Sequence, residues 1–399
     1  MAIQFAARCN NLKASEIREI LKITVRPEVI SFAGGLPAPE VFPVDEMRAI
    51  TTQVLEEAGS QALQYSTTEG YLPLRQQIAC RMNKVHRTGV TADNILVTCG
   101  SQQVLDFAGK VFLDEGDVVL CESPTYLAAI SAFKAYNPRF IAVPTDEGGM
   151  VITELKRILA TTPNVRLIYV IPDFQNPTGR TWTTERRRQF MEIINEYEIP
   201  VVEDNPYGEL RFEGEMPFAL KSLDTKGLVM FVSTFSKTFC PGMRIGWLAA
   251  ADKLREKFVL VKQAADLHTS TISQHIISKY LDKYDFDENL HRIREVYRKR
   301  RDTMLETMGR AFPEGVKFTY PQGGLFTWVE LPDHIKAVDL LMKCLEQDVA
   351  FVPGDSFFPN GGSYNTLRLN YSNMPEERIE EGINRMAGVI KNMLSESLQ

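Results

Sequence analysis

The stretch STFSKTFCPGMRIGW, residues 233–247, ends one apolar segment and begins another, and between them it holds a single lysine, Lys237. Hydroxyl side chains surround this lysine in the sequence: Ser233, Thr234, Ser236 and Thr238. A Pro-Gly pair follows, and then comes one arginine, Arg244. A solvated surface lysine needs no such setting, because its ammonium group is already strongly hydrated. The stretch therefore raises the hypothesis that the amine of Lys237 takes part in chemistry.

Working outward from this stretch, short apolar runs rich in β-branched residues alternate with helical patterns. The runs span residues 94–100, 117–124, 139–144, 165–172, 199–204, 227–237 and 244–250. This alternation is typical of a mostly parallel sheet that helices cover on both faces. The sequence thus predicts an α/β fold for the larger part of the chain.

The C-terminal part has a different pattern. A long helical stretch over 286–311 leads to a predicted strand pair within 316–331. Further strand segments (349–358 and 365–372) and a final helix follow. A chain of 399 residues exceeds what one hydrophobic core usually holds. We expect a large domain over 46–290 and a smaller α+β domain over 291–399.

Composition argues against several kinds of partner. The formal net charge of -6 disfavours nucleic acid, because phosphate binding requires a basic face. The densest basic run, VYRKRRD at 296–302, lies in a segment of helical periodicity and is interpreted as a solvated helix face. The N-terminal twenty residues contain acids and no long apolar run, so they predict neither a signal peptide nor a membrane span.

Cysteines and histidines give no sign of a metal site. The six cysteines form no CxxC pair, and the five histidines show no ligand spacing. Reduced thiols in the cytoplasm are the simplest interpretation. We expect no bound metal and a cytoplasmic location.

The candidate site residues follow the predicted strands, because ligands of open parallel sheets bind at the carboxyl ends of the strands. Ser101 and Gln102 open a helix after the first run, where free N–H groups favour a phosphate. Since a helix dipole contributes only about 0.3–1 kcal/mol at exposed sites, a tightly held phosphate needs more donors. Thr234, Ser236 and Arg244 could supply them.

Polar or aromatic side chains also lie at the carboxyl ends of three other predicted strands. Tyr126 and Asn176, taken singly, are explained by packing and by a turn. Asp204 differs, because it directly follows a very apolar run and a buried, unpaired carboxylate is costly. Its partner could be an arginine or a protonated ring nitrogen. Tyr207 follows three residues later.

Together these groups fit one cofactor, pyridoxal 5′-phosphate. Its aldehyde requires an amine, its phosphate requires several donors, its ring nitrogen requires an acid, and its ring face requires an aromatic partner. Lys237, the helix start at Ser101, Asp204 and Tyr126 offer these four features.

The sequence resembles the fold-type-I pyridoxal-phosphate aminotransferases of class I/II over nearly the whole chain. The resemblance rests on GSQQ, SPTY, NPTG, DNPY and TFSKTFCPGMRIGW, which occur in the order and spacing of that family. It implies a seven-stranded sheet, a homodimer with shared active sites, and ping-pong transfer of an amino group. The donor would be an α-amino acid, and the acceptor a 2-oxo acid such as 2-oxoglutarate.

The resemblance also implies roles for individual residues. Lys237 would bind the cofactor aldehyde and later move the proton, Asp204 would keep the ring nitrogen protonated, and Tyr126 would stack on the ring. Asn176 and Tyr207 would bind the ring hydroxyl. The phosphate would be held by Ser101, Gln102, Thr234, Ser236 and Arg244, and across a dimer interface by Tyr65.

Substrate binding is implied for four positions. Arg368 in TLRLNYS would bind the α-carboxylate, for which a bidentate guanidinium is well suited, beside Asn176. The segments ASEIREILKI and ISFAGGLPAPEVFP resemble the α-aminoadipate, kynurenine and broad-specificity subgroup. There an N-terminal segment, here 1–45, covers the site and joins the small domain, with Gly35 where the backbone approaches the substrate closely. Arg18 would then face the substrate side chain, or else be a plain surface residue.

Two alternatives remain open from the sequence. A lyase or decarboxylase could use the same scaffold, although Arg368 favours retention of the carboxylate. A regulator with an aminotransferase-like domain would need a DNA-binding module, and only about thirty residues precede SFAGGLP. The preferred amino donor, whether 2-aminoadipate, aromatic or of a broad range, is not distinguished.

Overall fold

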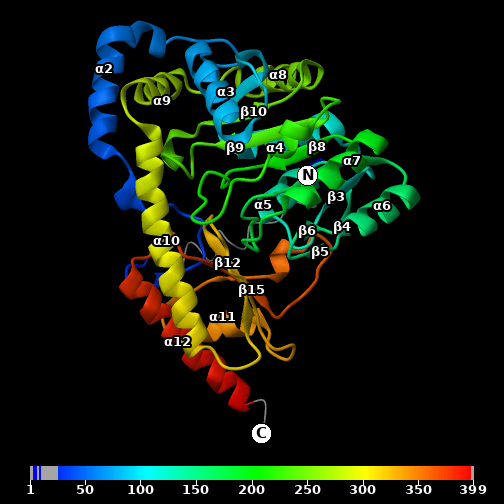
Figure 1. The fold of residues 1–399 in the computed structure, drawn as a ribbon, viewed down its shortest axis with the longest axis vertical. Coiled ribbons are helices and arrows are strands. Elements are labelled where there is room, and N and C mark those ends of the chain that lie inside the picture. Colours follow the sequence, from blue (N-terminus) through cyan, green and yellow to red (C-terminus); the bar gives the residue numbers. More distant parts are fainter. Residues whose placement is uncertain (1–2, 7–8, 10–25, 397–399) are drawn as a thin grey trace.

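A computed structural model describes residues 3–6, 9 and 26–396. Its central element is a seven-stranded sheet in the order β2-β10-β9-β8-β7-β3-β4 (Figure 1). The strands are β2 (Ile95–Thr98), β3 (Val118–Glu122), β4 (Arg139–Val143), β7 (Val165–Val170), β8 (Val201–Asp204), β9 (Val229–Thr234) and β10 (Gly246–Ala249). Only β10 runs antiparallel to its neighbours, and each of the seven predicted runs contains one strand. The predicted α/β fold is confirmed.

Helices cover both faces of this sheet because successive strand residues point to opposite sides. On one face Leu96, Val202 and Leu248 pack against α4 (Ser101–Phe112), α5 (Leu127–Lys134) and α8 (Asp252–Asp266). On the other, Ile168 and Val201 pack against helices α6 (Ile152–Thr161) and α7 (Thr184–Tyr197). Helices α3 (Leu72–His86) and α9 (Thr271–Lys283) complete that second face, and α2 (Val44–Ala62) packs on α9.

A second, antiparallel sheet of four strands has the order β11-β12-β15-β14. Its strands are β11 (Lys317–Phe318), β12 (Phe326–Glu330), β14 (Val352–Pro353) and β15 (Thr366–Asn370). Helices α11 (Ala337–Leu345) and α12 (Glu376–Glu396) pack in its core. Two small pairs complete the fold: β1 (Ile30–Ser31) with β13 (Val349–Ala350), and β5 (Thr145–Asp146) with β6 (Gly149–Met150). Pairing with β13 attaches the N-terminal segment to this smaller part.

The long helix α10 (Phe286–Ala311) connects the two sheet layers (yellow in Figure 1). Its first half contributes Leu290 and Tyr297 to the core of the large sheet. Its second half contributes Met304 and Met308 to the core of the small sheet. The predicted boundary after residue 290 therefore lies within a helix that belongs to both cores, and the division into 46–290 and 291–399 remains a prediction.

The basic run on α10 is only partly a solvated face, so that expectation is wrong for two of its residues. Arg300 and Arg301 are buried, at 4% and 1% exposure. Arg300 pairs with Glu40 and donates to the Ser372 carbonyl at 2.6 Å. Arg301 pairs with Glu213 and with Asp302. The carboxylate and carbonyl partners come mostly from distant segments, which helical periodicity does not reveal. Within the described part of the chain, no helix is long and apolar enough to cross a membrane.

Candidate active site

The residues predicted to hold the cofactor converge on one cavity of about 160 Å³. Ten of them line it: Ser101, Gln102, Tyr126, Asn176, Asp204, Tyr207, Thr234, Ser236, Lys237 and Arg244. They come from six separate segments of the chain and meet at the carboxyl edge of the parallel strands. Ile171, Pro206 and Pro241 complete the lining. The structure thus brings together side chains that the sequence separates by up to 143 positions, from Ser101 to Arg244.

Two glycines allow the backbone segments around the phosphate candidates to lie close together. A Cβ atom on Gly246 would lie 2.6 Å from the Ser101 amide nitrogen. Gly100 has a φ of 70° in the left-handed region, and a Cβ there would lie 2.6 Å from Nη2 of Arg244. Side chains at these positions would close the space beside the start of α4, where free N–H groups can bind an anion.

The phosphate candidates present donors on one side of the cavity. Thr234 Oγ1 donates to Ser236 Oγ at 2.9 Å, and the Ser236 amide donates to Thr234 Oγ1 at 3.1 Å. Within the described part of the chain, the hydrogen bonds of Arg244 are long contacts of 3.4 Å to the carbonyls of Cys99 and Pro241, which leaves its guanidinium available for a stronger partner. Gln102 donates to the Ala128 carbonyl at 3.2 Å.

The Lys237 amine lies against the N-terminal segment. Its Nζ donates to the Gly35 carbonyl at 2.7 Å, so the Gly35 backbone does approach the site. Burial, together with the nearby Arg368 and Arg244 cations, lowers the pKa of Lys237 to about 8. An amine with such a pKa is partly neutral near pH 7–8, which a nucleophile or base requires.

Asp204 has one oxygen bonded and one free. Tyr169, on β7, donates its hydroxyl to Oδ2 at 2.7 Å. Oδ1 is buried and has no hydrogen-bond partner among residues 3–6, 9 and 26–396. Burial raises the pKa of Asp204 to about 7, and the Tyr169 bond opposes that rise. A protonated ring nitrogen would supply the partner that Oδ1 lacks.

Arg368 is fixed by two hydrogen bonds and two aromatic rings. Its Nη1 donates to Asn176 Oδ1 at 2.8 Å, and its Nη2 donates to the Ala33 carbonyl at 2.6 Å. The guanidinium carbon lies 4.1 Å from the ring centre of Phe326 and 5.1 Å from that of Phe357. Burial lowers the pKa of Arg368 to about 10, so it stays charged at neutral pH. Arg368 does not itself line the cavity, but it contacts Asn176, which does.

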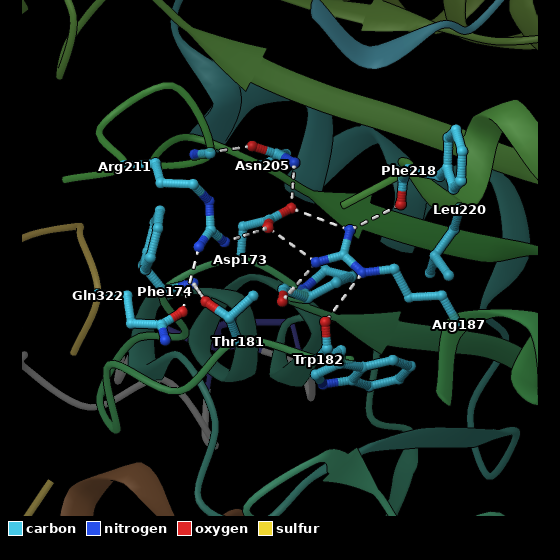
Figure 2. A network of polar contacts seen from close by, with 12 residues as sticks. Asp173, Phe174, Thr181, Trp182, Arg187, Asn205, Arg211, Phe218, Leu220 and Gln322 are labelled. Carbon is cyan, nitrogen blue, oxygen red and sulfur yellow. Dashed lines mark hydrogen bonds and ion pairs between the residues drawn. The ribbon is translucent and has the colours of Figure 1, made fainter. Parts of the chain in front are cut away.

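A buried polar network holds the loop that carries Asn176 (Figure 2). Arg187 uses all five of its N–H donors: it bonds both oxygens of Asp173, at 2.7 and 3.1 Å, and the carbonyls of Pro172, Trp182 and Phe218. Asp173 also accepts from Asn205 Nδ2 at 2.9 Å. The network therefore joins the two ends of the 172–182 loop to the residue that follows Asp204.

One predicted cofactor residue, Tyr65, lies elsewhere. Tyr65 is 79% exposed, does not line the cavity, and its ring meets His268 edge-on at 5.7 Å. Arg18 lies outside the described residues. The predicted contact of Tyr65 with the phosphate requires a second chain.

Sequence reasoning missed several residues around the site. Tyr169, Phe326 and Phe357 contact Asp204 or Arg368, and Arg187 holds the Asn176 loop. In the sequence the tyrosine and both phenylalanines are indistinguishable from core residues. The only available signal was the phenol of Tyr169, a polar group within an otherwise apolar strand.

Comparison with known proteins identifies the family. A model of aminotransferase class I and II matches residues 36–386. The chain belongs to the class I and II aminotransferases. It is 44% identical to an aromatic-amino-acid aminotransferase of Thermococcus litoralis over 97% of this chain and 94% of that protein. It is 43% identical to a 2-aminoadipate transaminase of Thermus thermophilus, over 98% and 97%.

A solved structure supports the same assignment. The α-aminoadipate aminotransferase LysN of Thermus thermophilus, complexed with N-(5′-phosphopyridoxyl)-L-leucine, superimposes with a TM-score of 0.91 at 41% identity. The match covers 98% of each chain. The aminotransferase is therefore a pyridoxal-phosphate enzyme of fold type I, which confirms the predicted activity and cofactor. The cavity fits this group, since it offers an amine, an unpaired acid oxygen and phosphate donors together.

Proposed function

We propose that this transaminase takes its amino group from 2-aminoadipate, aromatic amino acids or a broader range of α-amino acids. The acceptor is a 2-oxo acid such as 2-oxoglutarate. The proposal draws on relatives whose names give aromatic amino acids and 2-aminoadipate as substrates, at 44% and 43% identity. The buried Arg368 guanidinium supports an α-carboxylate as the shared recognition element.

The observation that carries this proposal is the shared cavity of Lys237 and Asp204. A lone amine whose pKa is about 8 and an acid with one unpaired buried oxygen line the same 160 Å³ space. Pyridoxal phosphate supplies an aldehyde for the amino group and a ring that accepts electron density. Lys237 would bind the aldehyde of the cofactor, and Asp204 would bind its ring nitrogen.

In this proposal, each residue at the active site has a definite role. Arg368 and Asn176 orient the substrate by its carboxylate, so that the Cα–H bond faces Lys237. The Lys237 amine would take up the Cα proton and deliver it to the carbon on the other side of the transferred nitrogen. Asp204 holds a proton at the ring nitrogen, and Tyr126 packs against the ring. The phosphate is bound by the start of α4 together with Thr234, Ser236 and Arg244.

A test of this proposal replaces the amine. Lys237→Ala is expected to abolish measurable transfer from a panel of amino acids to 2-oxoglutarate, because no other lysine lines the cavity described. Lys226→Ala is the control, since this exposed lysine pairs with Glu198 on the surface. Near-normal turnover by the Lys237→Ala enzyme would refute the assignment. Transfer rates across the panel would rank the donors.

We also propose that the enzyme works as a homodimer in the cytoplasm. Leu63, Tyr65 and Leu267 are exposed at 72%, 79% and 54%, and a second chain would cover such apolar side chains. Tyr65 of one chain would then reach the phosphate site of the other. All six cysteines are free thiols, which suits a reducing compartment.

A further inference from the structure

Tyr169 is held in one position beside the acid of the active site. It lies on β7, is 1% exposed, and its ring packs edge-on against Phe133 with centres 5.8 Å apart. Its hydroxyl reaches Asp204 Oδ2 at 2.7 Å, a short distance for a bond to a carboxylate. Both side chains are buried, so no solvent competes for this bond.

Because of this contact, the two oxygens of the Asp204 carboxylate have different partners. Oδ2 is occupied by the phenol, whereas the buried Oδ1 has no partner in the described chain. We propose that Tyr169 is a positioning residue, which fixes the Asp204 carboxylate so that Oδ1 faces the ring nitrogen of the cofactor. This inference rests on the proposed role of Asp204 as the partner of that nitrogen.

The hydrogen bond from Tyr169 also affects whether the proton shared by Asp204 and the ring nitrogen of the cofactor lies on the carboxylate or on the nitrogen. Burial alone favours the neutral form of Asp204, and the phenol O–H favours the anion. An anionic Asp204 accepts from a protonated ring nitrogen, whereas a neutral carboxylic acid leaves the ring uncharged. Among the described residues, Tyr126 and Tyr207 also interact electrostatically with Asp204, but the side-chain hydrogen bond to it comes from Tyr169. The hydrogen bond from Tyr169 therefore favours the anion of Asp204.

Removal of one oxygen atom tests this role. Tyr169→Phe keeps the ring and its packing on Phe133 but deletes the donor. The ligand is pyridoxamine 5′-phosphate, which has no aldehyde for Lys237, so its dissociation constant reports the non-covalent contacts alone. A bond to a charged group of this kind predicts binding weaker by about tenfold to a hundredfold. The absorbance of the bound cofactor should also lose the signature of a protonated ring at a lower pH than in the wild type.

Tyr371→Phe is the matched control. Tyr371 is fully buried, and its hydroxyl donates at the same distance of 2.7 Å, but to the backbone carbonyl of Gly323. Both variants lose one buried hydroxyl, and both should lower the melting temperature. Only Tyr169→Phe should change cofactor affinity and spectrum.

A double-mutant cycle with Asp204→Asn separates the possible failures. In the Asp204→Asn background, Tyr169→Phe should weaken cofactor binding no further. The inference is overturned if Tyr169→Phe binds as tightly as the wild type, or if it loses the same factor in both backgrounds. Unchanged affinity in Asp204→Asn alone would overturn the proposed role of Asp204 itself, and the inference with it.

Discussion

Burial sets the protonation behaviour of single residues in and near this site. It lowers the pKa of the Lys237 amine to about 8 and raises that of Asp204 to about 7. Glu122 shows the same effect at the end of β3, where burial raises its pKa to about 7. Its oxygens accept from the Ile171 amide at 3.0 Å and the Trp182 indole at 2.8 Å, and these bonds only partly offset burial.

Glu122 should make the protein less stable as the pH rises. The unfolded carboxyl titrates near 4.5 and the folded one near 7, so the folded state binds the proton more tightly. Its stabilising contribution is complete below 4.5 and is lost as the pH rises to 7. Relative to a Glu122→Gln variant, the free energy of unfolding of the wild type should fall by about 3 kcal/mol over this range. Urea unfolding of both proteins from about pH 5 to about pH 8 measures it, and parallel pH curves would contradict it.

At the scale of elements, the 172–182 loop depends on a helix that never touches the cavity. Arg187 on α7 binds both ends of this loop through Asp173, Pro172 and Trp182 (Figure 2). Phe174 within the loop has a φ of 49°, in the left-handed region that non-glycine residues rarely adopt. The surrounding bonds hold this conformation, and with it the position of Asn176.

Loss of the arginine should therefore be severe. Arg187→Met leaves the Asp173 carboxylate buried at 1% exposure without its main partner, which costs about 3–5 kcal/mol. Arg188→Met, one residue along the same helix but exposed, should cost less than about 0.5 kcal/mol. Denaturant unfolding of both variants compares them. Equal stability of the two would show that the network contributes little.

At the scale of the whole molecule, the proposed homodimer would let a second chain supply Tyr65 to the phosphate site. The Tyr65 side chain does not line the cavity of its own chain and is mostly exposed. A C2 dimer places the same surface of each chain against the other, so each chain would donate one tyrosine to its partner.

Hybrid dimers can test this exchange. Lys237→Ala and Tyr65→Ala proteins, each inactive at a limiting cofactor concentration, are co-expressed in equal amounts. If Tyr65 acts across the interface, half of the dimers hold one intact site, and activity returns to roughly a quarter of the wild-type value. If Tyr65 acts within its own chain, every site carries one defect and no activity returns. Sedimentation of the wild type would separately establish the oligomeric state.

The sequence by itself determined the α/β fold, the seven strands and ten residues of one cavity. It could do so because Ser101, Tyr126 and Asn176 follow strands, and Asp204 ends one, in a sheet whose carboxyl ends share an edge. Position along the chain therefore implied proximity in space, and the family motifs supplied the chemistry.

Only the tertiary structure decided which groups surround these residues. Tyr169 bonds Asp204 across two neighbouring strands, and Arg368 lies between Phe326 and Phe357. Arg301 is buried because its carboxylate partner Glu213 comes from 88 residues earlier in the chain. Local sequence patterns do not show which of these side chains contact each other, because side-chain partners are set by strand order, register and helix packing.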